Sequence, residues 1–396
     1  MTSDKRWLLP DGIDELLPER AAAVEQLRRA LLDDCANWGY QYVIPPLVEF
    51  TDSLLVGLGA DLDVITCKFA DRLSGRTLGV RADMTPQAAR IDAHSLGAEG
   101  VTRLCYAGST LHSAPQSVMA SRSPIQLGAE IYGCSDISAD LEVIDLMLAL
   151  LARADVAERH RPVTLDIGHV GIYEAVLAQA GLTGEQSDAV FDALQRKSGP
   201  DLAAVLGDLS PPLAATLNAL AVLHGAPDIL ADAKLLLKDI PTAVAALDQV
   251  SQVIAAVQRA HPEVSIYVDL AELRGFRYHT GLVFAAYLEG MGAAVAKGGR
   301  YDNVGAVFGR ERAATGFACD LKGLAELSTG GGETASIVSA PLINDADLAQ
   351  TVSYLRSNGR TVITALNGEH DPRCTEQLIK QGDGWVCQPL LQSELQ

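Results

Sequence analysis

Polar side chains of several hydrogen-bonding types occur in three short stretches of the sequence. They are Asp83, Thr85, Gln126, Glu130, Arg274, Tyr278 and His279. Carboxylates accept hydrogen bonds from ammonium groups, whereas amides and hydroxyls both donate and accept, so these types together suit a small polar ligand. Gln126 and Glu130 are four residues apart in a strand-like segment, which directs both to one face. The same spacing also fits a polar network between sheets, and residues 274–280 also fit a polar turn.

Other kinds of site have weaker support in the sequence. The seven cysteines are scattered and form no C-x-x-C pair, so neither a zinc site nor a disulfide framework is expected. Gly298, Gly299 and Arg300 lack the lysine and the helix start that a phosphate-binding loop needs. His112 stands beside a serine, and we assign it no catalytic role. The sequence therefore predicts no catalytic residue, no metal and no cofactor.

The composition of the chain argues against nucleic-acid and membrane partners and indicates a cellular compartment. The chain has 396 residues, with 31 Lys and Arg against 50 Asp and Glu, which gives a net charge of −19. The electrostatic field of this negative charge repels a phosphate backbone, so nucleic-acid binding is not expected. The N-terminus shows no apolar signal segment, and the apolar stretch 141–154 is charged and too short to span a bilayer. A chain without membrane association, in the reducing cytoplasm, is expected.

A sheet of short strands and amphipathic helices must position these polar side chains. Val24, Leu27, Leu31 and Cys35 follow one another at steps of three and four, which predicts a helix over 19–38. A second helix is expected around 141–151. Short apolar segments separated by loops predict a mostly antiparallel sheet. Its expected strands are 40–44, 78–81, 102–108, 126–132, 163–167, 265–270, 282–288 and 293–296.

Two further parts of the chain differ in composition from this core. Residues from about 171 to 262 are rich in Ala and Leu with helical periodicity, which indicates an inserted helical subdomain. Residues 328–334 form a Gly-rich linker between a first domain, 1–327, and a second, 335–396. The second domain reads as strand, helix and strand, which predicts a small, truncated α/β appendage.

Several motifs, in the right order, resemble the catalytic core of class II aminoacyl-tRNA synthetases, and histidyl-tRNA synthetase in particular, over about residues 8–327. The matching segments are GYQYVIPPLVE (39–49), RADMTP (81–86), the stretch 106–116 followed by QLGAE (126–130), LRGFRYHT (273–280) and GGRYD (298–302). The resemblance implies an α+β fold, an antiparallel sheet flanked by helices with the helical insertion and the C-terminal appendage. It also implies that the seven polar side chains named first bind histidine.

The sequence departs from the synthetase pattern at the positions that bind the phosphates of ATP. The synthetases hold the ATP phosphates with two arginines, because a rigid bidentate cation stabilises the charge that develops at phosphorus. His112 and Gly323 stand at those two positions, and Ala114 replaces a glutamate of the same motif. Losing one such stabilising group typically costs on the order of 10²–10³ in rate. The resemblance therefore predicts a degenerate adenylation site beside a better-kept histidine site.

A synthetase-like chain of this kind resembles the regulatory subunits of short-form ATP phosphoribosyltransferase. That resemblance implies a non-catalytic protein that acts with a catalytic subunit in the first step of histidine biosynthesis and in feedback inhibition by L-histidine. It also implies a hetero-oligomer, and a homodimer through the segment 39–49. The alternative is an active histidyl-tRNA synthetase or a related amino-acid ligase, which His112 and Gly323 oppose. A free-standing histidine sensor would share every motif.

Overall fold

The structure is a computed structural model, and it describes residues 8–55, 59–115, 120–154, 162–179, 182–196, 198–207, 211–271, 278–328 and 336–390. The chain divides into two compact units, residues 1–329 and 330–396. Each unit has its own hydrophobic core.

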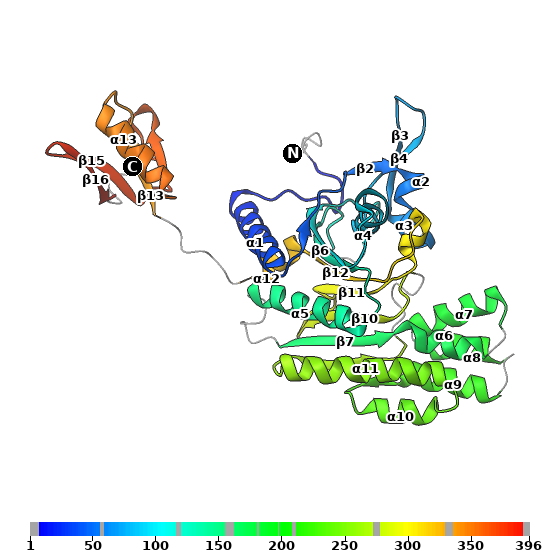
Figure 1. Ribbon diagram of the computed structural model, residues 1–396. Helices are drawn as coiled ribbons and strands as arrows, with labels where there is room; N and C mark the ends of the chain where they lie inside the picture. The colour runs from blue at the N-terminus through cyan, green and yellow to red at the C-terminus, as the bar shows by residue number, and fades with distance from the viewer. Residues whose placement is uncertain are drawn as a thin grey trace, which may run out of the picture. The chain divides into compact units, whose positions relative to one another are not determined.

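A nine-stranded sheet forms the centre of the first unit, in the order β1-β5-β6-β12-β11-β10-β7-β9-β8 (Figure 1). Most neighbouring strands are antiparallel, and the two parallel pairs are β1 with β5 and β7 with β9. The strands are β1 (Gln41–Tyr42), β5 (Thr102–Ser109), β6 (Ile125–Tyr132), β7 (Val163–His169), β8 (His224–Gly225), β9 (Ser265–Asp269), β10 (Leu282–Leu288), β11 (Ala296–Arg300) and β12 (Ala314–Asp320). This confirms the expected antiparallel α+β architecture.

Three long helices contact the sheet and one another on the side of its larger core. They are α1 (Pro18–Asn37), α5 (Ile137–Arg153) and α11 (Pro241–Ala260), with the short α12 (Leu321–Leu327) beside α1. Alternate strand residues, such as Leu127 and Ile131 on β6, point into this apolar core. The residues between them point to the opposite face, where Tyr106 and Tyr132 join a smaller cluster around Met84. That second face carries the polar side chains described below.

Smaller elements border the second face and extend the unit. A three-stranded sheet, β2-β4-β3, is formed by Val48–Phe50, Thr77–Val80 and Cys67–Ala70, next to α2 (Thr51–Leu54) and α3 (Gly59–Ile65). Helix α4 (Thr85–Arg90) continues into a π-helical turn, and a 3-10 turn spans Val304–Phe308. The inserted helices are α6 (Val170–Ala178), α7 (Gly184–Gln195), α8 (Gly199–Leu206), α9 (Pro211–Val222) and α10 (Ile229–Leu236), followed by α11.

The second unit is a small α/β domain. Its four-stranded sheet has the order β14-β13-β15-β16, formed by Thr361–Ala365, Ile337–Pro341, Glu376–Gln381 and Gly384–Pro389, with α13 (Ala346–Ser357) packed against it. Val338, Leu348 and Leu378 lie at the centre of its core. Asp345 begins α13 by accepting hydrogen bonds from the backbone N–H groups of residues 347 and 348.

Most expected elements are confirmed, but two strand predictions need correction and several strands were not expected. The strand expected over 40–44 is only two residues long, because its pairing with β5 ends at Tyr42 and the last hydrogen bond to β5 comes from the backbone N–H of Val43. The strand expected over 293–296 is wrong, since those residues belong mainly to a turn and β11 begins only at Ala296. Six described strands were not expected: β2, β3, β8 and β12 in the first unit, and β15 and β16 in the second, which was expected as strand, helix and strand. Of these, β12 lies beside β6 at the centre of the large sheet. Among the described helices, none combines the length and apolar character that crossing a bilayer requires.

Candidate functional site

Glu130 is the centre of the polar cluster on the second face of the sheet. It lies on β6 and is 1% exposed. The hydroxyl of Tyr106 donates to its Oε1 at 2.8 Å, and the hydroxyl of Tyr301 donates to its Oε2 at 2.5 Å. Burial raises the pKa of the Glu130 carboxyl to about 8, although both hydroxyl donors act in the opposite direction. Glu130 is therefore a preorganised hydrogen-bonding group whose charge responds to its surroundings.

Asp83 and Gln126 form the second part of the cluster. Asp83 Oδ1 accepts from Gln126 Nε2 at 2.7 Å and from the backbone N–H of Thr85 at 2.9 Å. Gln126 Oε1 in turn accepts from the backbone N–H of Met84 at 2.8 Å. These bonds hold the segment before α4 against β6. The carboxylate of Asp83 is therefore fixed at the start of the helix.

Thr85 joins the two parts of the cluster. Its hydroxyl lies 2.9 Å from the hydroxyl of Tyr106, which also binds Glu130. One chain of hydrogen bonds thus links Asp83 to Glu130 through the start of α4. Linked networks of this kind hold their members in fixed orientations.

Two glycines make room for these side chains on the sheet. A Cβ atom at Gly316, which pairs with Glu130 across β12 and β6, would lie 1.5 Å from Glu130 Oε2. A Cβ atom at Gly128 would lie 2.4 Å from the hydroxyl of Tyr106. Both distances are far below van der Waals contact. The buried carboxylate and the tyrosine ring lie where only glycine leaves space.

Aromatic rings border the cluster. Tyr278 stacks on Tyr301 with ring centroids 4.9 Å apart and an interplanar angle of 16°. The ring of His279 meets Tyr278 edge-on, also at 4.9 Å. The hydroxyl of Tyr301 also lies 3.2 Å from that of Tyr132. Of the polar residues expected from the sequence, the structure therefore brings six together, and the seventh, Arg274, lies outside the described residues.

The side chains at the positions related to ATP binding make internal contacts. The imidazole Nε2 of His112 lies 3.0 Å from the carbonyl oxygen of Ala82. The ammonium group of Lys322 lies 3.1 Å from Asp14 Oδ1. The neighbouring Gly323 offers no side chain. Within the described part of the chain, no group of His, Cys, Asp and Glu side chains could hold a metal ion.

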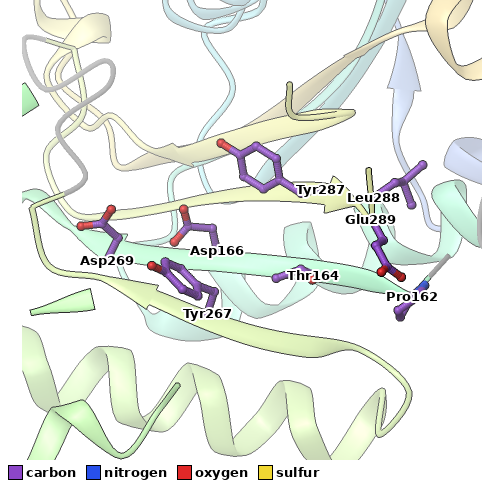
Figure 2. A pocket seen from close by; sticks show the side chains of 8 residues that line it. All are labelled: Pro162, Thr164, Asp166, Tyr267, Asp269, Tyr287, Leu288 and Glu289. Carbon is purple, nitrogen blue, oxygen red and sulfur yellow. The ribbon is translucent and has the colours of Figure 1, made fainter. Parts of the chain in front are cut away.

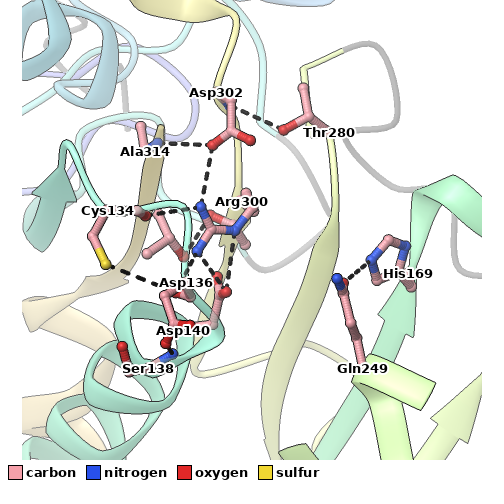
Figure 3. A network of polar contacts seen from close by, with 12 residues as sticks. Cys134, Asp136, Ser138, Asp140, His169, Gln249, Thr280, Arg300, Asp302 and Ala314 are labelled. Atoms are coloured by element: carbon pink, nitrogen blue, oxygen red, sulfur yellow. Dashed lines mark hydrogen bonds and ion pairs between the residues drawn. The ribbon is translucent and has the colours of Figure 1, made fainter. Parts of the chain in front are cut away.

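Arg300 belongs to a structural network (Figure 3). Its guanidinium contacts Asp140 at 2.6 Å, the carbonyl oxygen of Cys134 at 3.1 Å and Asp302 at 3.3 Å. Asp302 also accepts from the backbone N–H of Ala314 at 2.8 Å, which ties β11 to β12. The charge of Arg300 is thus matched by the buried Asp140 and the half-buried Asp302, so this residue serves the fold.

A cavity of about 440 Å³ lies farther along the sheet (Figure 2). Its lining residues come from the strands β7, β9 and β10 and from positions next to them: Pro162, Thr164, Asp166, Tyr267, Asp269, Tyr287, Leu288 and Glu289. Following the strand register from Glu130 across β12, β11 and β10 leads to Gly168 on β7. Asp166 is two residues away and shares that face. The cavity therefore opens on the sheet face that carries Glu130, but none of the expected ligand-binding residues lines it.

Sequence reasoning missed Tyr106, Tyr301 and Tyr132 as members of the cluster. Tyr106 lies opposite Gly128 in the register of β5 and β6, and Tyr301 directly follows β11. One signal in the sequence could have indicated Tyr106. It is a large aromatic residue on a predicted strand, and it pairs with a glycine on the next strand. The contact between Tyr301 and Glu130 joins residues 171 positions apart in the sequence, and no local pattern indicates it.

Solved structures share this fold. A crystal structure from Bacillus halodurans, described as an ATP phosphoribosyltransferase regulatory subunit/histidyl-tRNA synthetase, is 27% identical with a TM-score of 0.81 and covers 94% of this chain and 96% of its own. Histidyl-tRNA synthetase from a Nostoc species is 17% identical with a TM-score of 0.72, over 94% of this chain and 91% of its own, which shows the shared fold alone.

Sequence comparison resolves the family further. The family model for histidyl-tRNA synthetase matches residues 12–324, and the model for the ATP phosphoribosyltransferase subunit HisZ C-terminal domain matches residues 335–388. ATP phosphoribosyltransferase regulatory subunits from Marinobacter nauticus and Stutzerimonas stutzeri are each 48% identical, over 98% of this chain and their entire length. On its fold, its two matched regions and these relatives, the chain belongs to the family of ATP phosphoribosyltransferase regulatory subunits.

Proposed function

We propose that this chain is a non-catalytic subunit that binds L-histidine on the second face of its sheet and transmits this binding to the catalytic subunit of ATP phosphoribosyltransferase. The observation that carries the proposal is the continuous hydrogen-bonded cluster from Asp83 to Glu130. A buried carboxylate, an amide and hydroxyls in fixed positions suit a ligand with an ammonium group and ring nitrogens. Membership of the regulatory-subunit family supports the choice of partner.

The cluster suggests a role for each carboxylate. Both hydrogen bonds that Asp83 accepts from described residues go to Oδ1, and we assign Oδ2 to the ligand's ammonium group. Glu130 would accept a hydrogen bond from the imidazole ring, since each carboxylate oxygen can accept more than one. We also assign Gln126, Thr85, Tyr278 and His279 to the walls of this site, together with Arg274 from its sequence position.

The same arrangement supports the absence of adenylation. Lys322 is paired with Asp14, His112 is bonded to the carbonyl of Ala82, and Gly323 has no side chain. None of these three offers the bidentate cation that a transferring phosphoryl group needs. Exchange of pyrophosphate into ATP in the presence of histidine, at the rate of a synthetase, would support the alternative of an active ligase.

An exposed apolar segment supports self-association. Ile44 is 78% exposed, Leu47 50% and Tyr42 43%, and β1 is an edge strand of the large sheet. Exposed apolar residues beside an open strand edge suit a second copy related by a two-fold axis. We infer that the chain forms a homodimer through residues 39–49 and then a hetero-oligomer with the catalytic subunit. Its seven free cysteines fit a reducing cytoplasm.

Calorimetric titration of histidine tests the proposed site. Asp83→Asn keeps an oxygen that can accept from Gln126 and Thr85, and it removes only the charge offered to the ligand. Hydrogen bonds to charged groups contribute about 1.5–3 kcal/mol, so histidine should bind about 10–100 times more weakly. Asp232→Asn, which changes an exposed carboxylate on α10, is the matched control and should leave the affinity unchanged. Equal affinities for all three proteins would refute the assignment.

A further inference from the structure

His112 makes one side-chain contact that relates it to the candidate site. The residue is 8% exposed, and its ring Nε2 lies 3.0 Å from the carbonyl oxygen of Ala82. A carbonyl only accepts, so Nε2 carries the proton and donates. Among the described residues, the other ring nitrogen, Nδ1, has no hydrogen-bond partner. Leaving a buried ring nitrogen unpaired is unfavourable. Within the residues that the structure describes, the bond from Nε2 to Ala82 is therefore the one favourable hydrogen bond of this imidazole.

The main chain around His112 is itself held in place. Its backbone N–H donates to the carbonyl of Arg122 at 2.8 Å, and Arg122 Nε donates to the carbonyl of His112 at 3.0 Å. An isolated β-bridge joins His112 to Thr66, which is also buried. The backbone that carries the imidazole is therefore held in place by hydrogen bonds on both sides.

The segment that receives this bond carries Asp83. Ala82 directly precedes Asp83, and Ala82 is 6% exposed. Before Ala82, the backbone N–H of Arg81 donates to Leu47 and its carbonyl accepts from Leu111. After it, the hydrogen bonds from Gln126 and Thr85 hold the Asp83 carboxylate. The hydrogen bond from His112 thus fixes the peptide group of Ala82. This group lies between Arg81, whose backbone is bonded on both sides, and the carboxylate of Asp83.

We propose that His112 is a positioning residue for ligand selectivity, which holds the peptide of Ala82 so that the Asp83 carboxylate is aimed at the ligand's ammonium group. This inference rests on the proposed function. A side chain that acts in this way affects the part of the ligand that Asp83 contacts and leaves the imidazole end, at Glu130, undisturbed. It thus gives position 112 a role in binding that needs neither proton transfer nor contact with a phosphate.

The test compares two ligands on the full-length protein. L-histidine carries the ammonium group, whereas 3-(imidazol-4-yl)propionate has the same ring and carboxylate without it. His112→Phe keeps a planar ring but removes the donor to Ala82. Loss of one hydrogen bond corresponds to about a 3- to 10-fold decrease in histidine affinity, and the affinity for imidazolylpropionate should change less than twofold. Calorimetry measures the first ligand and NMR titration the weaker second one.

Two further variants separate positioning from a general loss of structure. His112→Gln restores an N–H donor and should recover most of the selectivity for histidine. In the Asp83→Asn background, His112→Phe should weaken histidine binding little further, because the charge that it positions is already absent. A parallel loss of affinity for both ligands, or no loss for either, would overturn the role of His112. If the unmodified protein binds neither ligand, the proposed function itself fails.

Discussion

Replacing a side chain in a buried polar cluster usually destabilises the fold. Replacing Glu130 with glutamine should instead increase the free energy of unfolding at pH 8. Burial raises the pKa of Glu130 from 4.5 to about 8, so the folded protein keeps a proton that the unfolded chain releases as the pH rises above 4.5. The free energy of unfolding therefore falls through the window from pH 4.5 to 8. One pKa unit corresponds to 1.36 kcal/mol, so the loss by pH 8 approaches about 5 kcal/mol.

Glutamine has nearly the shape of protonated glutamate and carries no charge at any pH. Its amide oxygen can accept from the hydroxyl of Tyr106, and its NH₂ group can donate to the oxygen of Tyr301. We therefore expect Glu130→Gln to match the unmodified protein near pH 5 and to be more stable at pH 8 by several kcal/mol.

Urea unfolding of both proteins, followed by circular dichroism between pH 5 and 8, measures this difference. Subtracting the two curves removes the contribution of the other titrating groups, which the substitution leaves unchanged. The difference should grow by about 1.4 kcal/mol per pH unit. A glutamine variant that is less stable by the same amount at every pH would show that Glu130 is ionised in the fold and would refute the reasoning.

Three further substitutions test the fold, the site and the dimer. Arg300→Met leaves Asp140 buried without its cation and should cost about 3–5 kcal/mol in urea unfolding; a cost below about 1 kcal/mol would contradict the network. Gly316→Ala places a methyl group on Glu130 Oε2, which should cost about 1–3 kcal/mol in stability and abolish histidine binding in calorimetry; unchanged binding would disprove the tight contact. Ile44→Glu should give a monomer in light scattering, and a persistent dimer would exclude residues 39–49 as its interface.

The general arrangement of the fold was predictable from the sequence. The errors of the prediction concern strands whose position depends on tertiary contacts. The apolar stripe from Val24 to Cys35 predicted α1 because those residues face one core. Strand β12, Ala314–Asp320, escaped prediction because its small residues carry little strand propensity and it forms through pairing with β6 and β11. The start of β11 was misplaced because the turn that precedes it is fixed by bonds to β10, such as Val295 to Ala286.

The residues proposed for the candidate site followed from the family resemblance, whereas the hydrogen bonds that connect them did not follow from the sequence. Gln126 and Glu130 share a face because a strand has period two, and that much follows from spacing alone. The contacts of Glu130 with Tyr106 and Tyr301 depend on strand pairing across long stretches of sequence. The position of His112 followed from the family resemblance, but its bond to Ala82 follows only from the bridge that places it there.

Inhibition of the reconstituted complex by histidine tests the central claim most directly. Pyrophosphate release by the catalytic subunit, mixed with this chain, should decrease as histidine is added. With Asp83→Asn the inhibition curve should move to about 10–100 times higher histidine, while the rate without histidine and the assembly of the complex stay unchanged. An inhibition curve identical for Asp83→Asn and the unmodified chain would contradict the claim that histidine regulates the enzyme from this site.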